Sequence, residues 1–262
     1  MGMSTEHLHF CHANGFPAKS YNVMLEALSK RHSVAYLDMY GHQQAYPVTD
    51  HWSYLVDELI EQIEQSHNQP VVAIGHSLGG GLIYLAARQR PELFKHLILL
   101  DPALIDNMTS KLVGLAKRFN FIDKITPAGR TSGRLETFDS HDHAMDYFSG
   151  KSLFKQADPR CLKDYVIHGT VQAHDGVHLR YSAETELAIY RTIPHTIKHV
   201  KDLQAVPGTF LYGEHSNVVR PGIIKAMNKM GFETHKMQGG HLFPLEFPEQ
   251  TASKINEIIE SL

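Results

Sequence analysis

The apolar positions of this chain follow two different periods. Over residues 52–63 they recur at i, i+3, i+4, i+7, i+8 and i+11, while four carboxylates take the opposite face, which is the pattern of an amphipathic helix. Further helices are indicated by apolar spacing near 24–28, 82–87, 223–230 and 252–262. The sequence therefore predicts several helices that each bury one face.

Short apolar runs separate these helices. They are rich in β-branched residues and favour strands buried on both faces. The runs lie at 7–11, 33–38, 70–74, 96–100, 208–213 and 233–237. Because helices alternate with such strands, neighbouring strands should run parallel with right-handed crossovers. The sequence predicts an α/β fold with a mostly parallel, doubly wound sheet of about six strands.

The alternation of strand and helix breaks down between residues 103 and 205. This stretch holds helix-like pieces at 112–119 and 184–192 and no convincing buried strand. About a hundred residues between two sheet strands predict a helical cap, or lid, folded over a functional site. Residues 1–102 and 206–262 would then form the core, although 103–205 could also be a separate domain.

Composition and charge argue against several classes of protein. The net charge is −3, and the 25 basic and 28 acidic residues are interspersed, so a nucleic-acid partner is not expected. No charged and apolar leader opens the chain, and no run approaches the roughly 18 apolar residues of a membrane span. Two cysteines, Cys11 and Cys161, are too few for a disulfide framework. We expect a cytoplasmic enzyme.

The segment Gly75-His76-Ser77-Leu78-Gly79 joins a predicted strand to a predicted helix. Glycine two positions before and after a serine, in this context, is the nucleophile-elbow pattern. The elbow exposes the Ser77 hydroxyl above the sheet, and the helix N-terminus offers backbone N–H groups to an oxyanion. The alternative is a glycine-rich turn without chemistry. A phosphate-binding loop would need a lysine or a G-x-G-x-x-G spacing, and neither is present.

A serine nucleophile needs a base, and the base needs a carboxylate partner. His241 follows a predicted strand and two glycines, so it can reach the same edge of the sheet as Ser77. His76 is adjacent to Ser77 but should point to the other side of the strand, which makes it structural. Asp101 ends the strand before the cap and is the candidate acid. It could instead cap the turn beside Pro102.

These segments resemble the α/β-hydrolase superfamily, and the resemblance covers nearly the whole chain apart from the cap. The elbow, the loop Asn14-Gly15-Phe16-Pro17, which is similar to the family's H-G-x-P loop, and Gly240-His241 occur in the family's order. The resemblance implies an oxyanion hole from the backbone N–H groups of Phe16 and Leu78, and acyl-enzyme chemistry without a cofactor. Asn14 departs from the usual histidine. The family's leading antiparallel strands should be absent, because few residues precede the first strand.

A larger departure concerns the acid. Many members carry aspartate in the loop after the strand that follows the cap, but here Gly213-Glu214-His215-Ser216 has serine at that position. Asp101 resembles the acid of other members, and Glu214 is the alternative acid.

These observations predict a serine hydrolase that cleaves an ester or similarly activated acyl group in a small, partly apolar molecule. A C–C bond hydrolase with the same triad, and a ligand-binding member with little turnover, are the alternatives. Residues 139–143 hold two histidines and two aspartates, but residues two apart do not share a helix face, so no metal is expected. A homodimer is left open.

Overall fold

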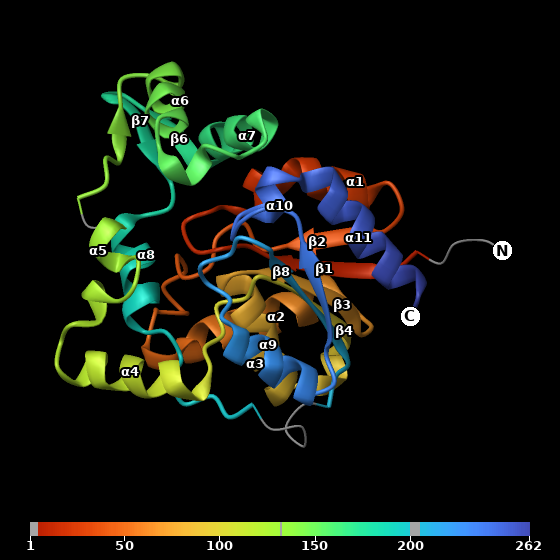
Figure 1. Cartoon of the computed structure of the whole chain (residues 1–262). Coiled ribbons are helices and arrows are strands. Elements are labelled where there is room, and N and C mark those ends of the chain that lie inside the picture. Colours follow the sequence, from red (N-terminus) through yellow and green to blue (C-terminus); the bar gives the residue numbers. More distant parts are fainter. Residues whose placement is uncertain (1–4, 132, 200–204) are drawn as a thin grey trace.

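A six-stranded parallel sheet forms the centre of the molecule (Figure 1). The computed structural model describes residues 5–131, 133–199 and 205–262. The strand order is β2-β1-β3-β4-β8-β9, and every neighbouring pair is parallel. The strands are β1 (His7–Cys11), β2 (Ser33–Tyr36), β3 (Val71–His76), β4 (Phe94–Leu100), β8 (Gly208–Gly213) and β9 (Glu233–Met237). The predicted fold class is confirmed.

Helices cover both faces of this sheet (Figure 1). One face packs against α1 (Asn22–Ser29) and α11 (Pro248–Glu260), which also contact each other, and the short α10 (Phe243–Glu246) precedes α11. The other face packs against α2 (Ser53–Ser66), α3 (Leu78–Gln89) and α9 (Pro221–Lys229). The apolar face of each helix lies in one of two buried clusters, one on either side of the sheet.

The amphipathic helix α2 differs from its predicted pattern at two positions, the first of which is Trp52, a buried residue with a positive φ of 59° just before the helix begins. Leu55, Leu59 and Ile63 are buried as the spacing predicts. Glu58, expected on the solvent face, is also fully buried, and its Oε2 accepts a hydrogen bond from the Gly41 N–H at 3.0 Å. A loop that covers the helix explains this difference, since hydrophobic spacing alone does not reveal which polar residues a loop will contact.

The parallel arrangement brings the carboxyl ends of several strands to one edge. His76, the last residue of β3, pairs with Leu100, the last of β4, and Leu100 pairs with Leu211 of β8. The residues that follow these strands therefore meet above the sheet. Ser77 and Asp101 stand directly after β3 and β4 at this edge.

Residues 103–205 form an insertion between β4 and β8. Its helices are α4 (Asn107–Arg118), α5 (Ala128–Thr131), α6 (His141–Ser149), α7 (Pro159–Gly169) and α8 (Ala183–Arg191). It also holds a three-stranded antiparallel sheet in the order β5-β7-β6, made of β5 (Thr137–Phe138), β6 (Thr170–Ala173) and β7 (Gly176–Leu179).

The expectation of an insertion without buried strands is therefore wrong for this small sheet. Its strands have two to four residues, too few to show the alternation that identifies a strand. Phe138 and Val177 are fully or almost fully buried, whereas Val171 in β6 is half exposed. The pairing of Ala173 with Gly176 leaves a two-residue turn, and Gly176 has a positive φ of 135°. The two turn residues are therefore His174 and Asp175, and the glycine follows them as the first residue of β7.

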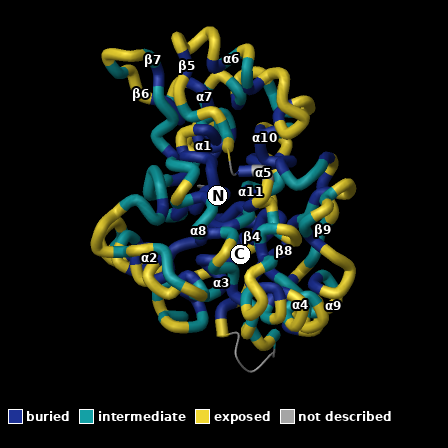
Figure 2. Tube along the Cα trace, turned by 90° about the vertical axis from the view of Figure 1, so that its left-hand side faces the viewer, coloured by how far each residue is buried: buried dark blue, intermediate teal, exposed yellow. Residues whose placement is uncertain are grey.

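Aromatic side chains connect the insertion to the core. Phe16, in the loop after β1, lies 5.2 Å from Tyr165 of α7 and 5.8 Å from Phe154 between ring centroids. Phe148 of α6 packs against both of these insertion residues. Figure 2 shows exposed positions along the periphery of both the insertion and the core, and the central strand β3 is buried over its whole length.

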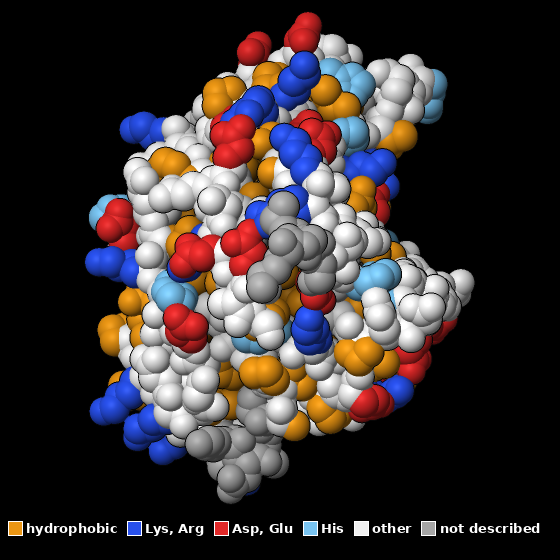
Figure 3. Space-filling view, turned by 90° about the vertical axis from the view of Figure 1, so that its right-hand side faces the viewer, with side chains coloured by type: hydrophobic (Ala, Val, Ile, Leu, Met, Phe, Trp, Pro, Cys, Tyr) orange, Lys and Arg blue, Asp and Glu red, His pale blue; other side chains and the backbone are white. Residues whose placement is uncertain are grey.

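Charged side chains of both signs are mixed on the face drawn in Figure 3. This agrees with a net charge of −3 and shows no basic stripe on that face. Among the described residues, every helix is too short or too polar to cross a bilayer.

Candidate active site

Ser77 occupies a sharp turn between β3 and α3. Its backbone has φ 52° and ψ −112°, a conformation that is strained for a residue with a side chain. A Cβ on Gly75 would lie 2.5 Å from the carbonyl carbon of Gly79, and a Cβ on Gly79 would lie 2.1 Å from the carbonyl oxygen of Cys11. Only glycine fits at these two positions, because α3 approaches both β3 and β1 this closely.

Three side chains predicted from the sequence form one hydrogen-bonded chain. The Ser77 Oγ lies 3.1 Å from the His241 Nε2, and the His241 Nδ1 lies 2.9 Å from the Asp101 Oδ1. Asp101 is fully buried, whereas His241 is partly exposed. Because a carboxylate only accepts, the neutral imidazole donates from Nδ1 to Asp101, and its bare Nε2 can accept the Ser77 proton.

Two further donors hold the Asp101 carboxylate. The Gly213 N–H donates to Oδ2 at 2.9 Å, and the Ser216 hydroxyl donates to Oδ1 at 2.7 Å. Ser216 stands at the loop position where the resembling family often has aspartate, and here it donates to a carboxylate from another strand. Glu214 instead lies 3.7 Å from the exposed His215 ring. Asp101 rather than Glu214 contacts His241.

His76 supports the segment that carries His241. Its Nδ1 lies 2.7 Å from the Tyr21 hydroxyl and its Nε2 lies 2.9 Å from the His241 backbone carbonyl. A carbonyl only accepts, so Nε2 carries the proton and Nδ1 accepts from the tyrosine. Burial, reinforced by the nearby His241, lowers the pKa of His76 well below its ordinary value. His76 thus remains neutral, and sequence reasoning missed its contact with His241.

The two backbone donors expected for an oxyanion differ in their contacts. Leu78 is the first residue of α3, so its N–H has no acceptor within that helix. The Phe16 N–H donates to the Ala13 carbonyl at 3.1 Å in a tight turn. In this structure Leu78 is the donor that helix geometry leaves available, and Phe16 is engaged within its own loop.

Asn14 connects the loop after β1 to the insertion. Its Nδ2 donates to the backbone carbonyl of Glu186 in α8 at 3.0 Å, and its Oδ1 accepts from the Tyr181 hydroxyl at 3.2 Å. Asn14 replaces the usual histidine of the resembling family, and its amide holds the loop after β1 against the insertion. No sequence signal linked residue 14 to residues more than 160 positions away.

One group of side chains among the described residues could hold a cation. Asp50, His51 and His195 each offer a ligand atom within 4.8 Å of the other two. The Lys117 ammonium, however, already contacts the Asp50 carboxylate. At the segment 139–143, His143 pairs with the exposed Asp139 at 3.2 Å. Both groups lie apart from the hydrogen-bonded chain described above.

Known proteins resemble this chain in sequence and in fold. A family model described as "Alpha/beta hydrolase family" matches residues 10–254. The solved structure of E-2-(acetamidomethylene)succinate hydrolase superposes with a TM-score of 0.79 and 17% identity, over 98% of this chain and 92% of that one. At this identity the likeness concerns the fold.

Two curated relatives match a smaller part of the chain. The type I acyl-CoA thioesterase mpaH of Penicillium brevicompactum is 28% identical over 110 residues, which are 42% of this chain and 23% of that protein. The monoglyceride lipase of Rattus norvegicus is 28% identical over 122 residues, which are 42% of this chain and 40% of that protein. The matches span less than half the length of these relatives.

Proposed function

This chain belongs to the alpha/beta hydrolase family, and from that premise we propose that it is a serine hydrolase that cleaves an ester or a similarly activated acyl group. The observation that carries the proposal is the hydrogen-bonded chain from Ser77 through His241 to Asp101. The names of the curated relatives, a thioesterase and a lipase, both describe enzymes that release acyl groups, which supports the same substrate class.

The proposed reaction has two steps. In the first, the Ser77 oxygen attacks the acyl carbonyl while the His241 Nε2 takes the serine proton, and the imidazolium then gives this proton to the departing alcohol or thiol. In the second, His241 takes a proton from the attacking water and returns it to the Ser77 oxygen as the acyl–oxygen bond breaks, which releases the acid product. Asp101 keeps the proton of neutral His241 on Nδ1 and stabilises its cation.

Oxyanion stabilisation is proposed for the backbone donors next to the serine. The Leu78 N–H, at the positive end of the α3 dipole, suits a developing negative charge on the carbonyl oxygen. Phe16 would contribute its N–H by sharing or exchanging its bond to the Ala13 carbonyl when the oxyanion forms. Of the two proposed oxyanion donors, Phe16 can therefore act only if its N–H shares or leaves its bond to the Ala13 carbonyl.

We also propose that residues 103–205 act as the cap. Tyr165 and Phe154 of this insertion pack against Phe16, beside the proposed oxyanion site, and their rings offer apolar contact to an acyl chain. A partly apolar acyl substrate fits these surroundings. The catalytic side chains themselves all come from outside the insertion.

Labelling with a fluorophosphonate probe and turnover of short p-nitrophenyl esters and thioesters test the proposal. Ser77→Ala should fold normally and lose both labelling and several orders of magnitude of turnover, because nucleophile and base act as a unit. Ser149→Ala, an exposed serine at the end of α6, serves as the control and should behave like the parent. Retention of most activity in Ser77→Ala would contradict the proposed mechanism.

A further inference from the structure

The insertion places a buried carboxylate against the loop that carries Phe16. Glu186 of α8 is 8% exposed. A Cβ built on Gly15 would lie 3.0 Å from the Glu186 carboxyl carbon and within 3.2 Å of both of its oxygens. The carboxylate therefore lies against the residue immediately before Phe16, and the Asn14 amide fastens the same loop to the Glu186 carbonyl.

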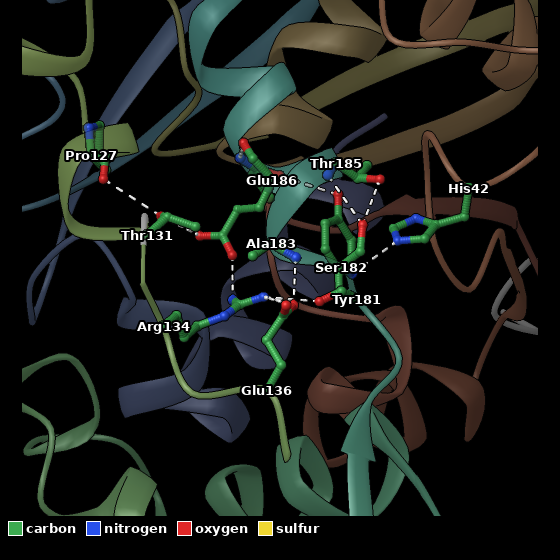
Figure 4. A network of polar contacts seen from close by, with 11 residues as sticks. His42, Pro127, Thr131, Arg134, Glu136, Tyr181, Ser182, Ala183, Thr185 and Glu186 are labelled. Atoms are coloured by element: carbon green, nitrogen blue, oxygen red, sulfur yellow. Dashed lines mark hydrogen bonds and ion pairs between the residues drawn. The ribbon is translucent and has the colours of Figure 1, made fainter.

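A cluster of insertion side chains surrounds this carboxylate (Figure 4). The Thr131 hydroxyl at the end of α5 donates to Oε1 at 3.1 Å, and the Arg134 guanidinium forms an ion pair with Oε2. Arg134 also donates to the Tyr181 carbonyl at 2.9 Å. In Figure 4 the Glu186 side chain points between Thr131 and Arg134. Among the described side chains, Arg134 is thus the cation that directly faces Glu186.

A second carboxylate lies on the other side of Arg134. The Glu136 Oε1 is 3.7 Å from the Arg134 Nη2 and accepts a hydrogen bond from the Ala183 N–H at 2.6 Å. The Glu136 side chain is 44% exposed, so water screens its charge more than that of Glu186. Removing Glu186 would leave Arg134 with an acidic partner, whereas removing Arg134 would take from both carboxylates the cation they share among the described residues.

An unopposed negative charge beside an oxyanion site would raise the energy of the transition state. We propose that Arg134 offsets the charge of Glu186 and so keeps the Phe16 loop suited to a developing oxyanion, which makes the two insertion residues positioning residues for the reaction. This inference rests on the proposed serine-hydrolase function. It assigns to the insertion a part in the rate of acylation in addition to substrate choice.

The charge argument predicts an asymmetry that a purely structural ion pair would not give. If the pair only fastened the insertion, Arg134→Met and Glu186→Gln should each slow the reaction, and combining them should recover nothing, because Arg134 also donates to the Tyr181 carbonyl. If charge matters, removal of the cation should slow the reaction, while removal of the anion should not. At an effective dielectric of about 20, an unopposed unit charge close to the oxyanion would slow acylation at least about tenfold.

The test compares Arg134→Met, Glu186→Gln and the double variant at about pH 8.5, because burial raises the pKa of the Glu186 carboxyl and loss of the Arg134 charge would raise it further. We expect Arg134→Met to lower kcat for a p-nitrophenyl ester at least about tenfold with little change in KM. Glu186→Gln should raise kcat, by up to about threefold, and adding it to Arg134→Met should recover most of the loss. Affinity for a trifluoromethyl ketone, which forms an oxyanion with the serine, should change in parallel with kcat.

Two further variants serve as controls. Arg134→Lys keeps the charge but not the planar fork that reaches both Glu186 and the Tyr181 carbonyl, so its kcat should lie well above that of Arg134→Met, and it keeps the test decisive if Arg134→Met fails to fold. Arg191→Met removes an exposed arginine at the C-terminal end of α8, the helix that carries Glu186. Arg191 pairs with Asp123 there, and this variant should behave like the parent.

The outcomes separate this inference from the proposed function. Equal losses in Arg134→Met and Glu186→Gln, or no loss in Arg134→Met, would overturn the charge inference while Ser77→Ala still abolished turnover. A loss in Arg134→Lys as large as that in Arg134→Met, or no recovery in the double variant, would also overturn it. Activity that survived in Ser77→Ala would instead contradict the proposed function itself.

Discussion

Replacing Asp101 by asparagine provides the most discriminating test of the proposed triad. Asp101 accepts three hydrogen bonds, with Oδ2 facing the Gly213 N–H and Oδ1 facing both the Ser216 hydroxyl and the His241 Nδ1. An amide has one accepting oxygen and one donating nitrogen, so it cannot accept on both sides. The backbone N–H can only donate, whereas the Ser216 hydroxyl and the imidazole can each exchange roles.

The asparagine should therefore turn its oxygen toward Gly213 and its NH₂ group toward His241. The imidazole would then accept at Nδ1 and carry its proton on Nε2, where it can no longer accept the Ser77 proton. Loss of the correct tautomer in a serine protease triad costs about 10⁴ in kcat, and we expect a loss of at least about a hundredfold here. The fold should survive with a loss of about 1–3 kcal/mol, because the buried position retains hydrogen-bonding partners.

The assay measures kcat for a p-nitrophenyl ester and the rate of fluorophosphonate labelling at neutral pH, with thermal unfolding as the check on folding. Glu214→Gln is the matched control, since it makes the same chemical change on a partly exposed side chain paired with His215. It should change kcat by less than about tenfold. If Glu214→Gln were crippling and Asp101→Asn mild, Asp101 would not be the acid, and the tautomer argument would fail with it.

Three further predictions concern residues around the site. Ser216→Ala removes one donor from Asp101 but leaves Gly213 and His241, so kcat should fall by about three- to tenfold, and a loss as large as that of Asp101→Asn would contradict this reasoning. Phe154→Ala should alter KM and the ranking of acyl-chain lengths more than the labelling rate of Ser77. Phe119→Ala, at a side chain that is 63% exposed, is the control and should change none of these quantities. Loss of labelling in a folded Phe154→Ala would mean that this ring takes part in the reaction of Ser77 itself. Burial raises the pKa of Glu58 from 4.5 to about 7, so its contribution to stability is present below about pH 4.5 and is lost as the pH rises through about 7. Glu58→Gln should gain stability relative to the parent over this range, by about 1–3 kcal/mol in urea denaturation, and a constant difference would contradict the assigned burial cost.

The sequence predicted the elements that follow from periodicity and from steric necessity. The strands of the central sheet and the stripe of α2 appear where apolar spacing indicated them, and the elbow glycines have no alternative once α3 packs on Cys11. Ser77, Asp101 and His241 follow strands whose carboxyl ends share an edge, so parallel topology alone brings them near one another. Their roles remain proposals.

Other features depend on contacts that no local pattern encodes. The strands of the insertion are held by one or two buried side chains each, such as Phe138 and Val177, which is too little for a detectable alternation. The burial of Glu58 requires a loop at Gly41, and the setting of Asn14 requires α8. Each depends on which distant segment packs on a polar group, and that is decided by the tertiary fold.

The donors around Asp101 also bear on how such a site can change during evolution. Ser216 and Asp101 approach the same point from two different strands, with the Ser216 oxygen 2.7 Å from the carboxylate oxygen that faces His241. A carboxylate on either backbone can therefore serve the same imidazole. Exchanging aspartate and serine between positions 101 and 216 would relocate the acid without moving His241 or the sheet. The position of the proposed acid could thus differ between two loops, whereas the proposed nucleophile is tied to a single turn by the glycines around it.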